Sequence, residues 1–236
     1  MTSPERSWGA VVVAAGRGTR FGRPKQLLPL SGLPLAAWSV RTFDEMSEID
    51  DLVIVTEVEW IEAMQGVIAQ LAPRVAWQVV GGGASRQQSV FAGLRALPER
   101  CEAVLVHDGA RPLVRAEDVR TAMREVRPGR GAVLAAPVVD TIKVVDPDSM
   151  VVTQTLDRGT LWGAQTPQLA MAKDLRRAHD DANKAGVEAT DDTALLERIG
   201  IEVIAVPSST ENFKVTLPED LIRAEALLRV RFENAP

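Results

Sequence analysis

A glycine-rich turn follows the first β-branched run of this sequence, and its residues are the ones best suited to chemistry. It reads AAGRGTRFGRPKQ over residues 14–26 and contains four cations, Arg17, Arg20, Arg23 and Lys25. Glycine lets the backbone approach a phosphate chain closely and direct N–H groups at it. Arginine adds a bidentate fork and lysine a point charge. The turn therefore predicts a triphosphate site, and the alternative for this loop alone is a solvated basic surface.

Two familiar nucleotide-binding motifs do not fit this turn. A P-loop requires Gly-Lys followed by Ser or Thr, and that tripeptide does not occur in the chain. The dinucleotide fingerprint G-x-G-x-x-G requires glycine at position 21, where Phe21 stands. The turn thus favours neither a P-loop ATPase nor a dehydrogenase.

The elements that must position this turn follow from the hydrophobic pattern. Short β-branched runs predict strands at 10–14, 52–55, 75–80, 104–106, 132–139 and 201–206. Helix-like segments lie near 34–43, 60–71, 86–97, 116–126, 171–185, 191–199 and 218–230. Continuous apolar runs separated by helices are typical of parallel strands covered on both faces. The sequence therefore predicts the α/β class, with a doubly wound, mostly parallel, Rossmann-like sheet that binds ligands at the carboxyl ends of its strands.

Two of the predicted helices begin with a capping-box pattern. Ser85 is followed by Gln88, and Thr216 is followed by Glu219, with Pro218 in the first helical turn. We expect these side chains to fix where the two helices start.

The alternation of strand and helix is interrupted once. Over residues 142–156 two β-rich runs flank the turn-forming sequence Asp146-Pro147-Asp148-Ser149, which predicts a β-hairpin. Since a hairpin alone is marginally stable in water, this one must pack on its own domain or on a second subunit. The sequence shows no internal repeat or linker. We predict one domain over residues 1–236, with an arm at about 140–158.

The composition limits the classes of function. The 236 residues include 27 Lys and Arg against 32 Asp and Glu, a net charge of −5, which argues against nucleic acid or an anionic membrane as partner. The single cysteine, Cys101, excludes an internal disulfide, and with two histidines it cannot complete a His/Cys zinc site. We see no signal peptide and no apolar run near the roughly 20 residues of a membrane-spanning helix. We therefore expect a cytoplasmic protein.

Further motifs follow the turn in a fixed order along the chain. They are GG-x-x-R-x-x-S at 82–89, HDGARP at 107–112, DTIK at 140–143, DR at 157–158, LW at 161–162, QTPQ at 165–168, TDD at 190–192 and NFKVT at 212–216. Together with the Pro-Lys-Gln at 24–26, they resemble the 2-C-methyl-D-erythritol 4-phosphate cytidylyltransferase family from residue 10 to about 222. Each motif alone is unspecific, but the ordered set is specific.

The resemblance implies a reaction between CTP and 2-C-methyl-D-erythritol 4-phosphate that gives the CDP-linked product and pyrophosphate. The second pKa of a phosphate monoester is about 6, so the substrate's own phosphate is ionised and would attack the α-phosphorus of CTP without a protein nucleophile. The enzyme would supply position and positive charge. The family's catalytic positions match Arg20 and Lys25, for the transition state, and Lys214 and Arg158, for the attacking phosphate.

The same resemblance implies the binding residues. The nucleotide would contact Ala14, Ala15, Gly16, Gly18, Gly83, Ser89, Asp108 and Gly109. The acceptor side would be lined by Arg111, Thr141, Thr166 and Thr190. Asp108 is also the candidate Mg²⁺ ligand, since Mg²⁺ takes one or two carboxylates plus substrate phosphates.

Several of these residues also have a structural interpretation. Asp108 can simply end a strand, and residues 190–192 suit a helix N-cap with an acidic first turn, which is compatible with ligand contact. We expect His107 to be a satisfied histidine at a strand end. We expect His179 to lie on a polar, solvated helix face.

The resemblance also implies a homodimer. The family's hairpin is an arm that crosses to a neighbouring subunit, and the matching positions put Thr141 and Arg158 into the partner's site.

Three other functions remain open from the sequence. A cytidylyltransferase acting on ribitol 5-phosphate or another polyol phosphate would differ only in its acceptor pocket. A nucleoside-diphosphate-sugar glycosyltransferase usually carries Asp-x-Asp, whereas Asp108 is followed by Gly109 and Ala110. A non-catalytic nucleotide-binding module would not need both Lys25 and Lys214.

Overall fold

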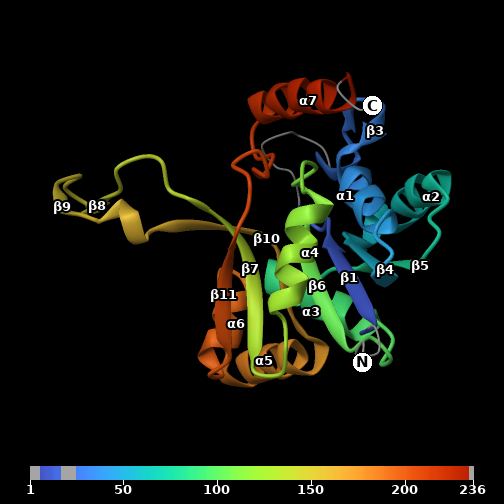
Figure 1. Cartoon of the computed structure of the whole chain (residues 1–236), viewed down its shortest axis with the longest axis horizontal. Helices are drawn as coiled ribbons and strands as arrows, with labels where there is room; N and C mark the ends of the chain where they lie inside the picture. The colour runs from blue at the N-terminus through green and yellow to red at the C-terminus, as the bar shows by residue number, and fades with distance from the viewer. Residues whose placement is uncertain (1–5, 17–24, 234–236) are drawn as a thin grey trace.

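The computed structural model describes residues 6–16 and 25–233, and seven strands of this part of the chain form one twisted sheet (Figure 1). Their order across the sheet is β11-β7-β10-β6-β1-β4-β5. The strands are β1 (Trp8–Val13), β4 (Ile49–Thr56), β5 (Ala76–Gly81), β6 (Ala103–Asp108), β7 (Arg130–Pro137), β10 (Trp162–Met171) and β11 (Glu202–Pro207). Six of them run parallel, and β10 runs antiparallel to both of its neighbours. The predicted mostly parallel sheet is confirmed.

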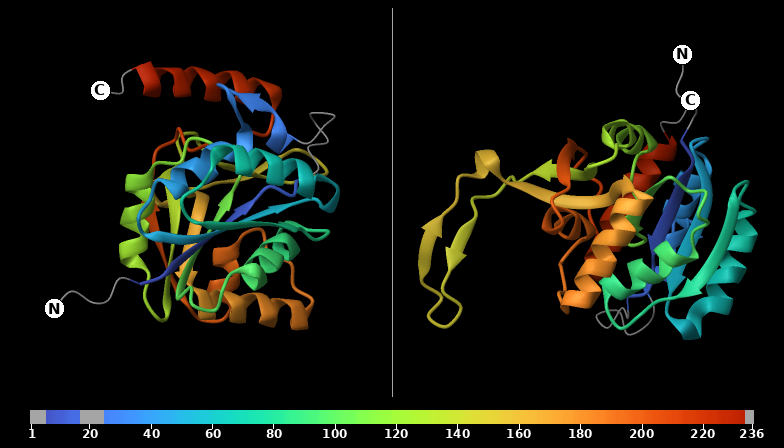
Figure 2. Two further views of the ribbon diagram at one scale, coloured as in Figure 1. Left: turned by 90° about the vertical axis from the view of Figure 1, so that its right-hand side faces the viewer. Right: turned by 90° about the horizontal axis from the view of Figure 1, so that it is seen from below.

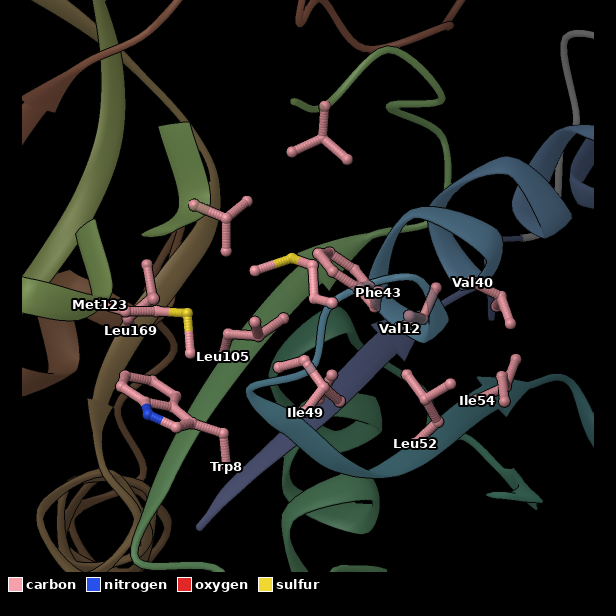
Figure 3. Packing of buried hydrophobic residues seen from close by; sticks show 14 of the residues in the cluster. Trp8, Val12, Val40, Phe43, Ile49, Leu52, Ile54, Leu105, Met123 and Leu169 are labelled. Carbon is pink, nitrogen blue, oxygen red and sulfur yellow. The ribbon is translucent and has the colours of Figure 1, made fainter. Parts of the chain in front are cut away.

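Helices cover both faces of this sheet. They are α1 (Leu35–Asp44), α2 (Ile61–Leu71), α3 (Arg86–Ala96), α4 (Ala116–Glu125), α5 (Ala172–Ala185), α6 (Asp192–Arg198) and α7 (Pro218–Glu233). Alternate residues of β1 enter two different cores because successive strand side chains point to opposite faces. Ala10 and Val12 pack with α1, α2 and α4, whereas Val11 and Val13 pack with α3, α5 and α6. The sheet is therefore doubly wound, and Figure 3 shows the first of these cores.

A third, smaller core lies beside the sheet and holds α7. It joins α7 and α1 to a short hairpin made of β2 (Pro29–Leu30) and β3 (Leu33–Pro34). Val215 is fully buried in this core, which fixes the chain segment just before α7.

The strand β10 is the main element that the hydrophobic pattern does not predict. Its residues read WGAQTPQLAM, and the polar side chains and Pro167 interrupt any apolar run. β10 is nevertheless inserted between β6 and β7, and its pairing with β7 is irregular between Ala164 and Gln168. Neighbouring strands on both sides, rather than its own sequence pattern, stabilise this segment as a strand.

The two predicted helix starts have different outcomes. Ser85 caps α3 by accepting a hydrogen bond from the Gln88 N–H, as the pattern predicts. At α7 the prediction is wrong in its acidic partner. Asp220, not Glu219, accepts hydrogen bonds from the N–H and the hydroxyl of Thr216. The helix starts at Pro218, so it is the Asp220 side chain that points back to Thr216.

The predicted hairpin is present and projects from the sheet. β8 (Lys143–Val145) pairs antiparallel with β9 (Val152–Thr155), and every residue of both strands is exposed. Figures 1 and 2 show the pair far from the helices and the sheet. The alternative that this hairpin packs on its own domain is therefore wrong.

No helix in the described part of the chain combines the length and the apolar character that crossing a membrane requires.

The contact between α3 and the sheet depends on a glycine. A Cβ atom at Gly93 would lie 2.4 Å from Val11 Cγ1 and 2.8 Å from Val55 Cγ2. We expect Gly93→Ala to lower the free energy of unfolding by about 1–3 kcal/mol, because the helix must move away from the sheet. Urea denaturation followed by circular dichroism measures this change.

Gly66→Ala is the matched control for this prediction. Gly66 also lies in a helix, but a Cβ atom there meets nothing within 4 Å. This variant is expected to gain about 0.5–1 kcal/mol from the reduced freedom of the unfolded chain. Equal stability changes in the two variants would contradict the packing argument.

Candidate nucleotide-binding and catalytic site

A cleft of about 500 Å³ opens at the carboxyl ends of four neighbouring strands, β6, β1, β4 and β5. The start of α3, the short helical turn η2 (Lys25–Leu27) and the segment around Lys214 complete its walls. This is the edge at which doubly wound sheets bind their ligands.

Two glycines shape one wall of the cleft. A Cβ atom at Gly82 would lie 2.7 Å from both Ala15 Cβ and Ser89 Oγ. At Gly83 it would lie 2.4 Å from Gln88 Cβ, and the Gly83 N–H donates to Ser89 Oγ at 3.1 Å. The missing side chain of Gly82 therefore lets the turn after β5 pack against Ala15, and that of Gly83 lets the same turn pack against the first turn of α3.

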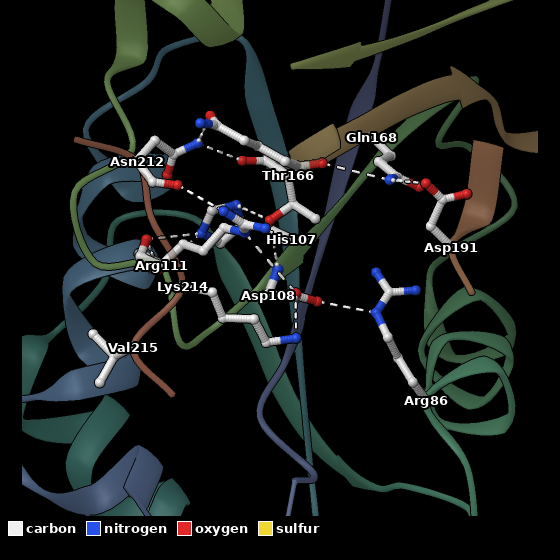
Figure 4. Close-up of polar contacts among 12 residues, drawn as sticks. Arg86, His107, Asp108, Arg111, Thr166, Gln168, Asp191, Asn212, Lys214 and Val215 are labelled. Carbon is white, nitrogen blue, oxygen red and sulfur yellow. Dashed lines mark hydrogen bonds and ion pairs between the residues drawn. The ribbon is translucent and has the colours of Figure 1, made fainter. Parts of the chain in front are cut away.

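A buried carboxylate, Asp108, lies at the centre of the site (Figure 4). Its Oδ1 accepts a hydrogen bond from Arg86 Nε at 3.0 Å, and its Oδ2 accepts one from Lys214 Nζ at 2.8 Å. Burial alone raises the pKa of Asp108, but the charges of Arg86 and Lys214 outweigh it and hold the pKa well below its ordinary value. Asp108 is therefore an anion at neutral pH.

Arg86 connects this carboxylate to a second buried one. Its Nη2 forms an ion pair with Asp192 Oδ2 at 2.9 Å, and Asp192 Oδ1 lies 3.2 Å from His179 Nε2. Burial lowers the pKa of Arg86, but the coulombic effect of Asp192 and Asp108 raises it above its ordinary value. The expectation that His179 is solvated is wrong, because its ring is fully buried and stacks on Phe91.

The backbone under Asp108 is supported by β10. The Asp108 N–H donates to Thr166 Oγ1 at 3.0 Å, and the same oxygen lies 3.1 Å from His107 Nδ1. His107 is fully buried, and burial lowers its pKa to about 4, so it is neutral at pH 7. Its Nε2 lies 3.1 Å from both Ser39 Oγ and the Arg111 carbonyl oxygen. As expected, His107 is a satisfied histidine at a strand end rather than a catalytic base.

Lys25 enters the same cleft from the other end of the chain. Its Nζ donates to the Val215 carbonyl at 2.9 Å, and the Val215 N–H donates to the Ala110 carbonyl at 2.8 Å. Lys25 and Lys214 both line the cleft. Two ammonium groups from distant parts of the sequence thus face one space, which suits a polyanionic ligand such as a phosphate chain.

Among the described residues, the cleft is lined by lysine, arginine and carboxylate side chains and by no cysteine or histidine. Cys101 is buried outside the cleft, where burial raises the pKa of its thiol to about 11. Residues 6–16 and 25–233 contain no group of three His, Cys, Asp or Glu side chains able to hold a metal ion. Positioning and charge neutralisation are the chemistry that this arrangement supports.

Comparison of the whole chain with known proteins shows which family it belongs to. The sequence model of the 2-C-methyl-D-erythritol 4-phosphate cytidylyltransferase family matches residues 9–230. The chain belongs to this family. The enzyme of that name from Caldanaerobacter subterraneus subsp. tengcongensis is 40% identical over 223 residues, which cover 93% of this chain and 98% of the relative. The chloroplastic one from Oryza sativa is 39% identical over 226 residues, covering 95% of this chain and 75% of the relative.

Solved structures of the same family share the fold. The crystal structure of 4-diphosphocytidyl-2C-methyl-D-erythritol synthase from Anaerococcus prevotii has a TM-score of 0.85 at 27% identity, covering 95% of this chain and 97% of that one. The 2-C-methyl-D-erythritol 4-phosphate cytidylyltransferase from Thermus thermophilus has a TM-score of 0.75 at 31% identity, covering 93% and 98%. The sequence-based family and fold predictions are confirmed.

The cleft gathers about half of the predicted site residues of this cytidylyltransferase family member. Those that line it are Ala15, Gly16, Lys25, Gly83, Ser89, Asp108 and Lys214. Ala14 is buried in the core at the end of β1, and the Gly109 N–H donates to the Val13 carbonyl at 2.9 Å. The predicted Arg20 and Gly18 lie outside the described residues. The roles of all these residues stay predictions.

The predicted acceptor-side residues are dispersed in one chain. Arg111 is largely buried and donates to the Asn212 carbonyl at 2.7 Å, and Thr166 lies beneath Asp108. Thr190 is exposed just before α6. Thr141 is exposed at the base of the hairpin. Arg158 lies after the hairpin, in the short turn η4 (Arg158–Thr160), and its Nη1 donates to the Val139 carbonyl at 2.9 Å. Neither of these two residues lines the cleft of its own chain.

The sequence did not predict the role of Arg86, which the structure places between Asp108 and Asp192. Arg86 stands in the GG-x-x-R motif, and its charge beside two glycines was a usable signal. As expected for residues 190–192, Asp191 caps α6 by accepting the Ala194 N–H at 2.8 Å, and Asp192 lies in the first turn of this helix. What the sequence did not show is that the Asp192 carboxylate is buried and pairs with the Arg86 guanidinium.

The Thr166 hydroxyl supports a stability prediction. We expect Thr166→Val to lower the free energy of unfolding by about 1–3 kcal/mol, because the Asp108 N–H and His107 Nδ1 lose their shared buried partner. Chemical denaturation without any ligand measures this loss separately from activity. Thr121→Val is the control, since that exposed hydroxyl only donates to the Glu117 carbonyl one turn earlier in α4. A Thr166 variant as stable as this control would contradict the supporting role.

Proposed function

We propose that this protein transfers a cytidylyl group from CTP to 2-C-methyl-D-erythritol 4-phosphate, giving 4-diphosphocytidyl-2-C-methyl-D-erythritol and pyrophosphate. The observation that carries the proposal is the convergence of Lys25, Lys214 and Arg86 on the glycine-walled cleft around Asp108, in a chain of this family. Residues 1–236 act as one nucleotidyltransferase domain in this proposal.

The acceptor's phosphate is the nucleophile in this reaction. One of its oxygens forms a bond to the α-phosphorus of CTP, and the bond from that phosphorus to the bridging oxygen of pyrophosphate breaks. Since the second pKa of a phosphate monoester is about 6, the attacking oxygen is ionised at neutral pH and no protein base is needed. This agrees with a site in which His107 is buried and neutral and Cys101 lies elsewhere.

Lys25 and Arg20 neutralise the charge that builds up on the phosphate chain as pyrophosphate leaves. A cation fixed in advance stabilises such a transition state without reorganisation during the reaction. Lys25 is held for this task by the Val215 carbonyl, which belongs to the buried core under α7.

Lys214 exchanges partners when the substrates bind. Its ammonium group pairs with Asp108 Oδ2, and its side chain is more than a third exposed, so an incoming phosphate can reach it. We assign to Lys214 the binding of the attacking phosphate, together with Arg158.

Asp108 is the proposed protein ligand of Mg²⁺. The residues fit this ion, because the Asp108 carboxylate lines the cleft and Mg²⁺ requires few protein ligands when phosphates supply the others. When bound, the ion would neutralise phosphate oxygens beside Lys25 and Lys214. Arg86, which also lines the cleft, holds the Oδ1 atom of this carboxylate.

The nucleoside lies along the glycine wall. Gly83 and Ser89 are the proposed contacts of the base and the ribose, and the other proposed contacts of the nucleotide are Ala14, Ala15, Gly16, Gly18 and Gly109. A pocket whose polar groups pair with one base discriminates strongly, because another base leaves these groups unpaired.

We further propose a homodimer in which the hairpin arm enters the partner's site. The arm exposes Met150, Val151 and Val152, with 73%, 59% and 53% of their surface accessible, which is costly for an arm that contacts nothing. Thr141 and Arg158 then reach the partner's acceptor pocket, beside its Arg111, Thr166 and Thr190.

Pyrophosphate release tests the function and the role of the lysines together. The native protein is expected to release pyrophosphate from CTP, and far more slowly from ATP, GTP or UTP, only when 2-C-methyl-D-erythritol 4-phosphate is present. Lys25→Ala and Lys214→Ala are each expected to lower turnover by about 10²- to 10³-fold, as for the loss of one fixed donor to a transition state.

Lys173→Ala on α5 is the control for charge alone, because this exposed lysine lies outside the cleft. Faster turnover with ribitol 5-phosphate would overturn the acceptor assignment. Near-normal turnover in Lys25→Ala would overturn the role of that lysine.

Mixed dimers test whether the arm completes the partner's site. Lys25→Ala and Arg158→Ala are each expected to be inactive alone. After co-refolding, half of the dimers are mixed and each has one intact site, so about a quarter of the native activity returns under two-fold symmetry.

A mixture of Lys25→Ala and Lys214→Ala is the control for this experiment. Both lysines belong to the cleft of the same chain, so no dimer of these variants has an intact site. Absence of recovery in the first mixture would mean that each site is built within a single chain.

A further inference from the structure

One wall of the cleft contains a carboxylate that the proposed reaction does not use. Glu57 follows β4 directly, and its side chain is partly buried in the cleft wall. Its Oε1 is shielded from solvent and accepts no hydrogen bond from any residue in the described ranges 6–16 and 25–233. A buried acceptor without a donor is unfavourable, and a ligand that supplies the donor removes this cost.

The order of the strands places Glu57 away from the phosphate end of the cleft. Asp108, with Lys214 on its carboxylate, ends β6, and Glu57 follows β4, two strands further along the sheet. At about 4.8 Å per strand, their backbones are roughly 10 Å apart. A triphosphate that lies against Lys25 and Lys214 therefore directs its nucleoside toward β4 and β5.

The glycine wall lies directly beside Glu57. The Gly82 N–H donates to the carbonyl of Thr56, the residue before Glu57, at 2.7 Å. The same turn continues through Gly83 to Ser89 Oγ. Glu57 thus belongs to the part of the cleft that receives the base rather than to the part that receives the phosphates.

The chemistry of the nucleotide decides which donor can meet this carboxylate. The phosphate oxygens of CTP are acceptors, so its donors are the ribose hydroxyls and the exocyclic amine of cytosine. The ribose lies between the phosphates and the base, closer to Asp108. Uracil carries a carbonyl oxygen in place of the amine of cytosine, so it presents an acceptor where cytosine presents a donor.

We propose that Glu57 is a specificity-determining residue that accepts a hydrogen bond from the exocyclic amine of cytosine and disfavours uracil. This inference rests on the proposed use of CTP. With UTP the carboxylate would face a carbonyl oxygen, so one side chain both attracts the correct base and repels the closest competitor.

Glu57→Gln is the sharpest test, because it preserves the shape of the side chain while adding a donor. A glutamine amide can accept from cytosine or donate to uracil, so it no longer separates the two bases. The ratio of kcat/KM for CTP to kcat/KM for UTP is expected to fall on the order of 10- to 100-fold. Calorimetry with each nucleotide, without acceptor, is expected to show the same loss of preference in Kd.

Glu59→Gln is the matched control. Glu59 lies two residues further along, in the short turn η3 (Val58–Trp60) that follows Glu57, and it also borders the cleft but is exposed. It undergoes the same change of charge, and the preference for CTP over UTP is expected to stay at the native value. A fall of equal size in both variants would mean that only the net charge of the wall matters and would overturn the proposal.

Other results would also overturn the role of Glu57. An unchanged ratio, or equal weakening of CTP and UTP, would mean that Glu57 does not read the base. A changed preference for CTP over 2′-deoxy-CTP, with CTP and UTP still separated, would assign Glu57 to the ribose.

Measurements of nucleotide binding and of pyrophosphate release by the native protein distinguish a failure of this inference from a failure of the proposed function. If it binds CTP but releases no pyrophosphate with any acceptor, the proposed function fails, while the calorimetric ratio still decides the role of Glu57. If it binds neither CTP nor UTP, both fail.

Discussion

The structure of this site depends on keeping one buried carboxylate charged. Removing Asp108 from water is unfavourable unless cations and hydrogen bonds replace the solvent. Arg86, at the start of α3, and Lys214, before α7, supply this replacement at the carboxylate, and the Thr166 hydroxyl on β10 accepts the backbone N–H of Asp108. Each of these elements must therefore be in place before the cleft has its charge pattern. A single electrostatic requirement thus links segments from most of the chain.

The antiparallel strand β10 couples this requirement to the fold. Thr166 reaches the backbone of Asp108, and Gln168 Oε1 accepts the N–H groups of Asp192 and Thr193 at 2.8 and 3.0 Å. β10 therefore supports the site from below and positions the start of α6, whose Asp192 holds Arg86. The chain also enters β10 directly after the exposed arm and the short turn η4. The strand β10 is thus in contact with Asp108 and with Asp192, the partner of Arg86, and it is joined in sequence to the arm that we propose reaches another subunit.

The cleft of one chain is well equipped for a nucleotide and poorly equipped for a second substrate. Its lysines, glycines and Asp108 suit a triphosphate and a nucleoside, whereas Thr141 and Arg158 lie on or near the projecting arm. A shared site would explain this separation, since an arm fixed by a partner can bring the acceptor's phosphate to the nucleotide only in the assembled dimer. The exposed apolar residues of the hairpin would then be buried in the same step.

Local patterns in the sequence determined the strands, the helix start at Ser85, the hairpin and the family, because burial of β-branched runs and ordered motifs are properties of short segments. They did not determine β10, whose polar residues become a strand only between two neighbours. Nor did they reveal that Arg86, Asp192 and His179 form one buried chain of contacts, or that Asp220 rather than Glu219 caps α7. The ion pair of Asp108 and Lys214 joins residues 106 positions apart. Such contacts depend on how distant elements pack, and only the tertiary structure decides that.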